Sequence, residues 1–253
     1  MVDGGRHSGL DEPVEVTRLR AQADAIRSLL TREALERPGD DLRRLVGLQQ
    51  LVVELRRMAP LARAQVCVLQ PRYFYDPEEP GVALARRAAR DRGVQTLLIT
   101  RPSTLRTHPL LPSIYPRTRL GPVFLRAMIV DETDLLVEGP DTAEGERSSW
   151  STSRPEVVRA VVEHWHATRA LSEPILPAGT EPPLSERQLE VCRLLAVGEK
   201  DQVIARVLGT SARTVEREVH AILRELGASS RTEAVLLMGG RGVNGGWPEA
   251  NPT

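Results

Sequence analysis

The sequence has little of several residue types that mark particular classes of protein. Its 253 residues include only two cysteines, Cys67 and Cys192, which lie far apart within apolar runs. This spacing predicts neither a disulfide framework nor a metal site. No apolar run approaches the roughly 18 residues that a membrane span needs, and the first residues do not resemble a secretion signal. We therefore expect a cytoplasmic protein that has no membrane partner, metal or cofactor.

An excess of charge of either sign is also absent. The 34 basic and 34 acidic residues cancel to a formal net charge of 0, and Lys200 is the single lysine. The chain as a whole therefore has no long-range field that would attract nucleic acid or an anionic membrane. Any nucleic-acid site has to be a local patch. The apolar share of 41% is ordinary for a globular protein and excludes disorder of the whole chain.

Hydrophobic periodicity predicts helices at the start of the chain and a βαβ unit after them. Residues 14–35 and 41–58 carry apolar residues at three- and four-residue spacing, which predicts two helices and an N-terminal helical region over 1–60. Residues 65–70 and 94–100 are β-prone runs with a helical segment between them. Two such strands joined through a helix form a parallel pair, so a parallel sheet is expected.

An α/β domain is expected to extend from residue 61 to residue 171. A strand, a tight turn and a second strand follow over 123–139, and a helix with a broad apolar face follows over 155–171. His164 and His166 lie two positions apart on this helix and therefore point in different directions. We expect them to face solvent and not to share a metal ion.

Proline and glycine mark three segments outside the regular elements. Residues 101–122 are rich in proline and are expected to lie outside the core. Residues 172–183 carry four prolines and no periodic pattern, which predicts a semi-stiff linker before a second domain at 184–238. Residues 239–253 are rich in glycine and almost free of apolar residues, so a disordered tail is expected.

The second domain divides into four short helices, because Gly198, Gly209 and Gly227 interrupt its periodic pattern. The third helix is expected over 212–226, with Ser211 as its N-cap. Its apolar residues repeat at spacings of 4, 3 and 4, which places them in one buried stripe. These residues are Val215, Val219, Ile222 and Leu226.

The same helix carries a basic edge nearly opposite the apolar stripe. Arg213, Arg217, His220 and Arg224 repeat the spacing of 4, 3 and 4, so they share one side of the helix. An α-helix fits the major groove of B-form DNA, where arginine pairs with guanine or neutralises phosphates. This arrangement is typical of a recognition helix. The alternative is that an arginine-rich surface helix shows four such residues in line merely as a solvated face.

The whole segment 184–238 resembles the LuxR/FixJ-type helix-turn-helix family, and the match needs no gaps. The matching residues are Leu184, Arg187, Glu190, Val191, Leu194, Ala196, Gly198, Ile204, Ala205, Leu208, Ser211, Thr214, Val215, Ile222, Leu226, Gly227, Arg231, Glu233 and Ala234. The resemblance implies an all-α four-helix domain that binds double-stranded DNA, and a dimerisation surface on the helix over 231–238. The alternative for that last helix is ordinary packing onto the first helix of the domain.

The resemblance also implies a set of DNA-binding residues. Base contacts are expected from Glu216, Arg217 and His220. Backbone contacts are expected from Lys200, Arg213, Thr214 and Arg224, beside the capping residue Ser211. The sequence departs from the family at Glu216, Glu218 and Glu225, where basic residues or histidine are usual, and acidic and basic residues are equal in number over 184–238. We therefore expect weaker non-specific DNA binding than in a basic member of the family, and more reliance on dimerisation.

The α/β domain is similar to half of a phospholipase-D-like domain, through the string Phe124-x-Arg126-x4-Asp131. The family signature has histidine where this chain has Phe124, and a phenyl ring can neither attack phosphorus nor carry a proton. The domain is therefore expected to be a non-catalytic sensor. Joined to a TrmB-like helical region before it and the LuxR-type module after it, it resembles a group of actinobacterial transcription regulators.

These observations predict a two-domain protein of mixed class. Its α/β part is phospholipase-D-like and its all-α part is LuxR-type. The expected function is that of a sequence-specific transcription regulator, active as a homodimer on double-stranded DNA and not as an enzyme. RNA polymerase and an unidentified small-molecule or protein effector are candidate partners. Two alternatives remain open: a phosphodiesterase or nuclease that uses Arg126 and Asp131, and a protein-interaction adaptor that has lost DNA binding.

Overall fold

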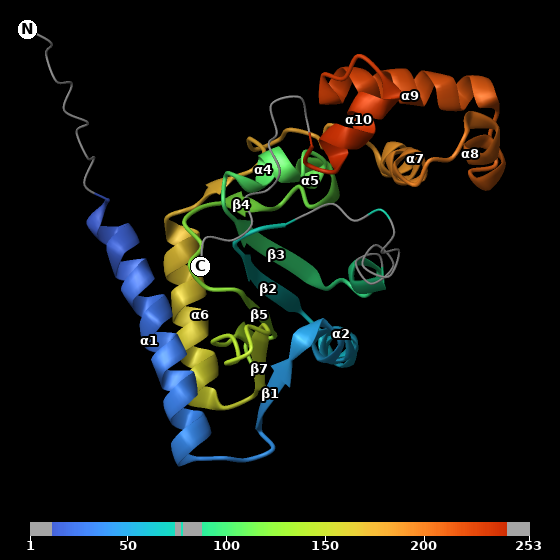
Figure 1. Ribbon diagram of the computed structural model, residues 1–253. Coiled ribbons are helices and arrows are strands. Elements are labelled where there is room, and N and C mark those ends of the chain that lie inside the picture. Colours follow the sequence, from blue (N-terminus) through green and yellow to red (C-terminus); the bar gives the residue numbers. More distant parts are fainter. Residues whose placement is uncertain (1–11, 74–76, 78–87, 242–253) are drawn as a thin grey trace, which may run out of the picture.

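The computed structural model describes residues 12–73, 77 and 88–241. An α/β domain built on one mixed sheet occupies most of the chain, and a compact group of four helices follows it (Figure 1). The expected class, a mixed α/β part followed by an all-α part, is confirmed. The expected tail over 239–253 lies outside the described residues from position 242 onward.

The sheet has eight strands in the order β1-β7-β6-β5-β2-β3-β4-β8. β2 and β3 pair in parallel, as do β3 and β4, and all other neighbours are antiparallel. The parallel pair β2–β3 is the strand pair of the expected βαβ unit, and most of the helical segment expected between the two strands lies outside the described residues. The strands are β1 (Leu42–Val46), β2 (Gln65–Gln70), β3 (Gln95–Thr100), β4 (Arg119–Leu120), β5 (Ala127–Val130), β6 (Asp134–Glu138), β7 (Ser148–Thr152) and β8 (Glu173–Pro174).

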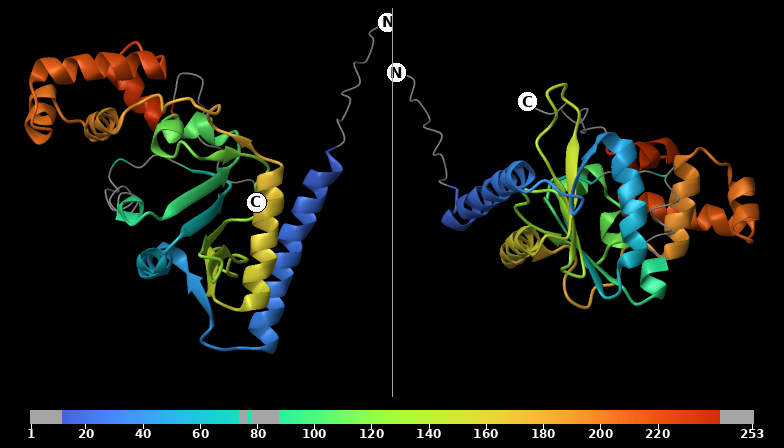
Figure 2. Two further views of the ribbon diagram at one scale, coloured as in Figure 1. Left: turned by 180° about the vertical axis from the view of Figure 1, so that it is seen from behind. Right: turned by 90° about the horizontal axis from the view of Figure 1, so that it is seen from below.

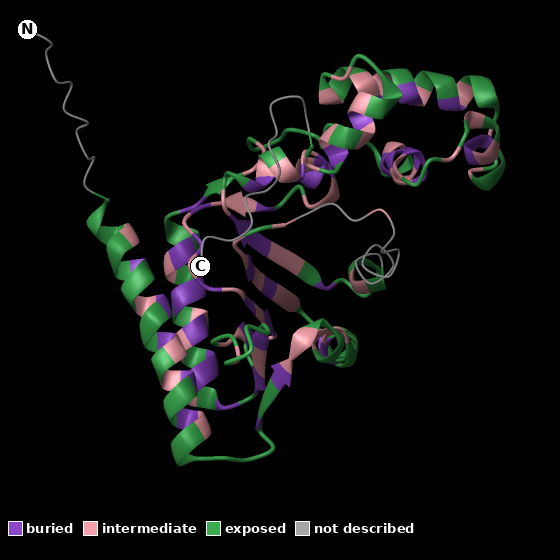
Figure 3. Ribbon diagram, in the orientation of Figure 1, coloured by how far each residue is buried: buried purple, intermediate pink, exposed green. Residues whose placement is uncertain are grey.

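Helices cover both faces of the sheet (Figure 2). The antiparallel helices α1 (Val14–Glu36) and α6 (Pro155–Ala170) pack side by side on one face, over a core that includes Leu30, Ile129 and Trp165. On the other face, α2 (Gly47–Met58) and the 3-10 helix η1 (Ala59–Leu61) lie over a second apolar cluster. Because both faces are covered, the interior strand β6 buries three consecutive apolar residues. Figure 3 shows buried residues along the strands and on the sides of α1 and α6 that meet.

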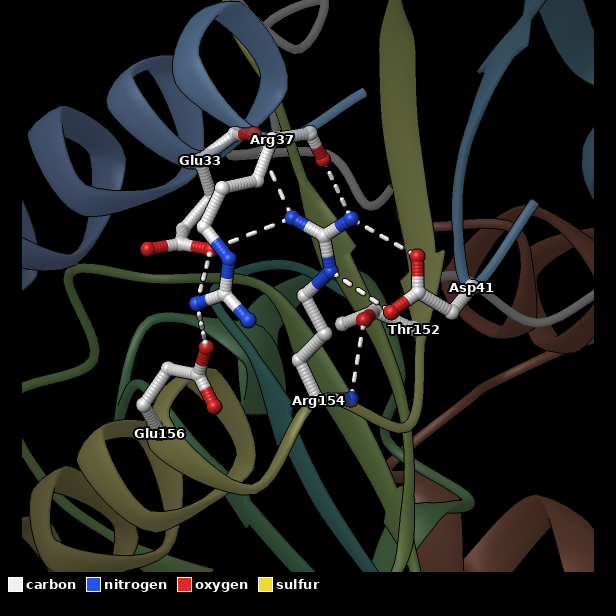
Figure 4. Close-up of polar contacts among 6 residues, drawn as sticks. All are labelled: Glu33, Arg37, Asp41, Thr152, Arg154 and Glu156. Atoms are coloured by element: carbon white, nitrogen blue, oxygen red, sulfur yellow. Dashed lines mark hydrogen bonds and ion pairs between the residues drawn. The ribbon is translucent and has the colours of Figure 1, made fainter. Parts of the chain in front are cut away.

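A cluster of ion pairs around the buried residues Arg154 and Glu33 joins α1 to α6 (Figure 4). Arg154, 5% exposed, precedes α6 and places its Nε 2.9 Å and one terminal nitrogen 2.7 Å from the two carboxylate oxygens of Asp41. Its other terminal nitrogen donates to the carboxylate of buried Glu33 at 3.1 Å. Arg37 lies between Glu33 and Glu156 and pairs with both carboxylates. The cluster fixes the end of α1 against the start of α6.

The expected helix over 41–58 is wrong in its first part. Residues 42–46 form the edge strand β1, which pairs with β7 and buries Leu42 and Leu45. The three-residue spacing of these leucines fits a helix equally well, but pairing with β7 decides the conformation. Gly47, the first residue of α2, has φ +76 and turns the chain from the strand into the helix. The expected helical region over 1–60 is therefore part of the sheet domain over its described residues.

Two further expectations about irregular segments and histidines are wrong. The stretch 101–122 contains α4 (Thr104–Thr107) and α5 (Leu111–Ile114), and Leu110 and Leu111 are fully buried. The prolines of this stretch interrupt the periodic pattern of the sequence, but its two leucines are still packed in the core. The helix over 155–171 is confirmed as α6. Of its two histidines, His166 is exposed as expected, whereas His164 faces α1 and is 1% exposed. The linker over 172–183 begins with β8, which extends the sheet edge beside β4.

The C-terminal part has the four helices that the sequence predicts. They are α7 (Glu186–Ala196), α8 (Asp201–Val207), α9 (Ala212–Leu226) and α10 (Arg231–Met238). α9 packs against the other three, and Val191, Ile204, Ile222 and Met238 are completely buried between them. This small core is separate from the two cores of the sheet domain.

Candidate nucleic-acid interface

The helix α9 begins and ends at strong local signals. The hydroxyl of Ser211 accepts a hydrogen bond from the backbone N–H of Thr214 at 3.1 Å, which satisfies one of the free donors of the first turn. Gly227 ends the helix in the left-handed conformation at φ +64, which residues with a side chain rarely adopt. The capping role expected of Ser211 is therefore present, and α9 has the bounds that the sequence predicts.

One side of α9 is buried and the opposite side is open to solvent. Val215, Val219 and Ile222 are between 0% and 3% exposed. The side chains expected on the basic edge are all exposed, namely Arg213, Arg217, His220 and Arg224. Thr214 is half-buried beside the cap, and Glu216 is exposed next to Arg217. The structure thus brings the candidate residues of α9 onto one accessible surface. We call its four residues Arg213, Arg217, His220 and Arg224 the basic edge, and Glu216 lies beside it.

A tight turn joins α8 to α9 and holds the two helices against each other. Gly209 has φ +60, and the backbone N–H of Thr210 donates to the carbonyl oxygen of Ala205 at 2.8 Å. Ile204 and Ala205 bury the inner side of α8 against α9. Lys200 is the exposed residue before α8. A short helix, a turn and a longer helix with a solvent-facing edge form the arrangement with which helix-turn-helix proteins enter the major groove.

Acidic residues weaken the positive field of this surface. Glu218 lies 3.8 Å from a terminal nitrogen of Arg217, and the Arg217 side chain is 78% exposed. Such an exposed pair contributes little to stability, but it places negative charge beside the central arginine of the edge. The equal numbers of acidic and basic residues expected from the sequence therefore include an acidic neighbour at the central arginine of this surface.

The last helix packs inward and also keeps an exposed apolar residue. Ala234 and Met238 are fully buried against α7 and α9. Arg231 at its start pairs with Asp201 at the start of α8, at 2.5 Å. Leu236 is 43% exposed. Packing onto the first helix of the domain accounts for Ala234 and Met238, while Leu236 remains available for contact with another molecule.

The sheet domain docks onto α7, which the sequence did not predict. Leu110 precedes α5, is 1% exposed and belongs to the core of the helical domain. The backbone N–H of Leu184 donates to the hydroxyl of Ser113 at 3.0 Å, and Arg90 pairs with Glu186 at 2.9 Å. α7 and α10 face the sheet domain, and α9 lies on the far side (Figure 1). The basic edge is accessible in this docked arrangement.

The phospholipase-D-like string has structural contacts. Asp131 directly follows β5 and has φ +47. Its carboxylate accepts hydrogen bonds from the backbone N–H groups of Arg63, Ala64 and Gln65 at 2.7, 3.0 and 2.8 Å. These three bonds help to lower the pKa of Asp131 and fix the entry into β2. Burial lowers the pKa of Arg126, whose Nε has no hydrogen-bond partner among the described residues.

Phe124, at the position of the family's histidine, packs its ring under the guanidinium group of Arg20 at 4.2 Å. The described residues contain no group of three or more His, Cys, Asp or Glu side chains arranged to hold a metal ion. Among the helices in the described ranges, none has the length and apolar character to cross a membrane.

Comparison with known proteins agrees with this division of the chain. Residues 182–238 match the family described as bacterial regulatory proteins, luxR family. A bialaphos biosynthetic pathway regulatory protein from Streptomyces hygroscopicus is 34% identical over 137 residues, which are 53% of this chain and 48% of that protein. The chain thus spans about half the length of this curated relative.

Two solved structures have similarity to larger parts of the chain. The archaeal chromatin protein TrmBL2 is 17% identical, with a TM-score of 0.42, over 63% of this chain and 65% of its own. The phospholipase D family member Nuc from Salmonella typhimurium is 15% identical, with a TM-score of 0.42, over 54% of this chain and 99% of its own. The family match and the helical geometry together identify the C-terminal domain, residues 182–238, as a LuxR-type helix-turn-helix domain.

Proposed function

We propose that this protein is a sequence-specific, DNA-binding transcription regulator whose helix α9 enters the major groove. The observation that carries the proposal is the exposed basic edge of α9, held by a buried stripe and a short bracing helix within a LuxR-type domain. Arg217 lies at the middle of the edge and is the candidate for base recognition, together with Glu216 and His220. Lys200, Arg213, Thr214 and Arg224, beside Ser211, are the candidates for phosphate contacts.

Two copies of the chain would bind two half-sites. A single domain with as many acidic as basic residues gains little from non-specific attraction, so a second copy supplies the missing affinity. Exposed Leu236 on α10 is the candidate apolar contact between copies. A regulator of bacterial transcription acts in the cytoplasm, where RNA polymerase is a candidate partner.

The sheet domain serves as a non-catalytic sensor in this proposal. Both carboxylate oxygens of Asp131 accept hydrogen bonds from the backbone at the start of β2, so they are not available to a substrate. Phe124 has no nucleophilic group, so phosphodiester chemistry by this route is not expected. The relative from Streptomyces hygroscopicus is named as a regulatory protein, which supports regulation over catalysis. The docking of α5 on α7 gives the sensor a route to the DNA-binding domain.

The proposal is tested by measuring the affinity of the full chain for genomic DNA fragments at low and physiological salt. Arg217→Ala is expected to weaken binding to the preferred fragment by about 1 to 3 kcal/mol and to relax its sequence preference. Arg159→Ala removes an exposed arginine from α6 and serves as the matched control, with unchanged affinity. Absence of any salt-dependent binding would favour a protein-interaction adaptor and overturn the proposal.

A further inference from the structure

An ion pair joins the first residues of α8 and α10. A terminal nitrogen of Arg231 lies 2.5 Å from the carboxylate oxygen Oδ2 of Asp201, which stands 30 residues earlier in the chain. The side chain of Asp201 is 26% exposed, and its other oxygen, Oδ1, is buried without a hydrogen-bond partner in the described part of the chain. Arg231 is thus the one hydrogen-bond partner of this carboxylate among the described residues. The contact fixes the start of α8 against the start of α10.

The helices α8 and α9 form one unit, which carries the basic edge. The tight turn at Gly209 joins them, and Ile204 of α8 is completely buried where the two helices pack together. α9 also packs against α10 through the apolar core of the domain. Apolar burial is non-directional, so it constrains the rotation of the α8–α9 unit against α10 less than a directional bond does. A charged hydrogen bond has a preferred length and direction, so Asp201 and Arg231 supply this constraint.

The other end of α10 lies against the sheet domain. Gly240 follows the helix by two residues and has φ +75, and a Cβ atom there would lie 3.1 Å from both the Cα and the carbonyl oxygen of Thr107 in α4. Only a glycine allows this close approach. α10 lies between α9 and the sheet domain (Figure 1). The helix therefore contacts α4 near its end and α8 at its start, and it gives the α8–α9 unit a fixed reference.

We propose that Asp201 and Arg231 are positioning residues that set the spacing of the two DNA half-sites recognised by a pair of chains. Leu236 on α10 is exposed and is the candidate contact between copies. Copies that meet through α10 place their two α9 helices at a distance given by the angle between each α8–α9 unit and its own α10. In dimeric helix-turn-helix proteins this geometry decides which half-site separation fits. The inference rests on the proposed function, because it concerns the same DNA-binding surface.

Neither residue has to touch DNA for this role. A binding surface has to be held to within about 0.5 Å of its productive geometry by supporting contacts, and this ion pair is such a contact for the α8–α9 unit. A partly exposed pair contributes little to the stability of the fold. Its loss should therefore change which spacing is preferred and leave the helical domain folded.

The experiment measures binding of the full chain to duplexes that carry two half-sites, as defined by footprinting on the preferred genomic fragment. The spacer between the half-sites is lengthened or shortened by single base pairs, and we expect the wild type to favour one spacing. Asp201→Asn and Arg231→Gln should each reduce this preference by about two- to fivefold, the range for a partly exposed ion pair. The two substitutions change the net charge in opposite directions, so a common effect does not come from charge. Affinity for a duplex with a single half-site should stay within about twofold of the wild type, which shows that α9 is intact.

Three further variants serve as controls. The double variant Asp201→Asn/Arg231→Gln should lose no more of the preference than either single variant, because residues that act through one contact are not additive. Arg231→Lys keeps a cation beside Asp201 and should retain most of the preference. Arg187→Gln removes an exposed arginine of α7 that has no ion-pair partner among the described residues, and it should match the wild type.

Several results would overturn the positioning role and leave DNA binding in place. These are an unchanged spacing preference in Asp201→Asn and Arg231→Gln, additive losses in the double variant, or a wild type that favours no spacing. Weaker binding of Arg231→Gln to a single half-site, with a salt dependence reduced by about one, would make Arg231 a phosphate contact and would also overturn it. If the wild type binds no DNA, the proposed function fails and this inference fails with it.

Discussion

The backbone N–H of Leu184 donates a hydrogen bond to the hydroxyl of Ser113 at 3.0 Å, and both residues are buried. Leu184 is the last residue before the capping box of α7, and Ser113 belongs to α5 of the sheet domain. A sensor and a DNA-binding domain joined only by a proline-rich linker would move independently. This hydrogen bond and the side chain of Leu110, which lies in the core of the helical domain, hold α7 against the sheet domain.

Replacing Leu110 with alanine is expected to lower the free energy of unfolding by about 2 to 5 kcal/mol, because a fully buried side chain leaves a cavity between two domains. Calorimetry should resolve a separate transition of the helical domain in this variant. Amide hydrogen exchange at Leu184 should become faster.

Leu48→Ala is the control, since the same substitution at a leucine that is 69% exposed should cost no more than about 0.5 kcal/mol. Slow exchange at Leu184 in the Leu110→Ala protein would mean that the contact between the domains does not depend on Leu110.

Arg154 is expected to be the most sensitive charged residue of the sheet domain. Arg154→Ala leaves the carboxylate of Glu33, a residue 6% exposed, without its buried partner, which should cost about 3 to 5 kcal/mol in urea unfolding. Arg154→Lys should recover only part of this, because a lysine cannot form the paired contacts to Asp41.

Arg37 pairs with the same Glu33 but is 61% exposed, so Arg37→Ala should cost no more than about 1 kcal/mol. Equal losses in the Arg154→Ala and Arg37→Ala proteins would show that burial does not set the strength of this cluster.

Local sequence signals predicted the elements that local interactions decide. α9 follows directly from the Ser211 cap, the apolar stripe and Gly227, and α6 follows from its broad apolar face. The sequence of β1 fits a helix as well as a strand, because only pairing with the distant strand β7 decides its conformation. The strands β4 and β8 contain two residues each, which is too short for an alternating pattern to appear.

The candidate DNA-binding residues other than Lys200 and Ser211 could be grouped from the sequence because they lie on one regular helix, α9, where spacing in sequence gives position in space. The residues that join the domains could not be predicted, since Leu110 and Ser113 belong to the short helix α5 and its N-cap, and their contact with the segment around Leu184 is made across about 70 residues of sequence. A leucine pair within the proline-rich stretch 101–122 was the one available hint that this segment is buried.

His164 is expected to make the fold sensitive to mild acid. Burial, with a smaller contribution from the charge of Arg27, lowers its pKa to about 4, and an unfolded histidine has a pKa near 6.5. The unfolded chain therefore takes up the proton first, so the stabilising effect is complete above about pH 6.5. It is lost as the pH falls toward 4, by about 3 kcal/mol in total.

The His164→Gln variant should lose this part of the pH dependence in urea unfolding measured between pH 7 and pH 4. His108 is also buried, with a pKa lowered to about 4, so a second part of the dependence should remain. His166→Gln changes the exposed histidine of the same helix and should follow the wild-type curve. Parallel curves for His164→Gln and the wild type would contradict the assignment.

Glu216 is expected to limit the attraction of α9 for the DNA backbone. It is exposed beside Arg217, at a position close enough to the duplex to repel phosphates once the helix enters the groove. Glu216→Lys should therefore strengthen binding to a non-specific duplex. The slope of the logarithm of affinity against the logarithm of salt should become steeper by about one, the value for each added phosphate contact.

The matched control is Glu163→Lys, which makes the same charge change at an exposed position of α6, in the sheet domain. The new lysine lies farther from the duplex, and salt screens charges over roughly 8 to 10 Å at ordinary ionic strength. The salt dependence of DNA binding by this variant should therefore stay near that of the wild type. If both variants steepen the slope equally, net charge alone governs binding. If neither does, the N-terminal half of α9 does not face the phosphates, and the direction in which this helix enters the groove has to be reassigned.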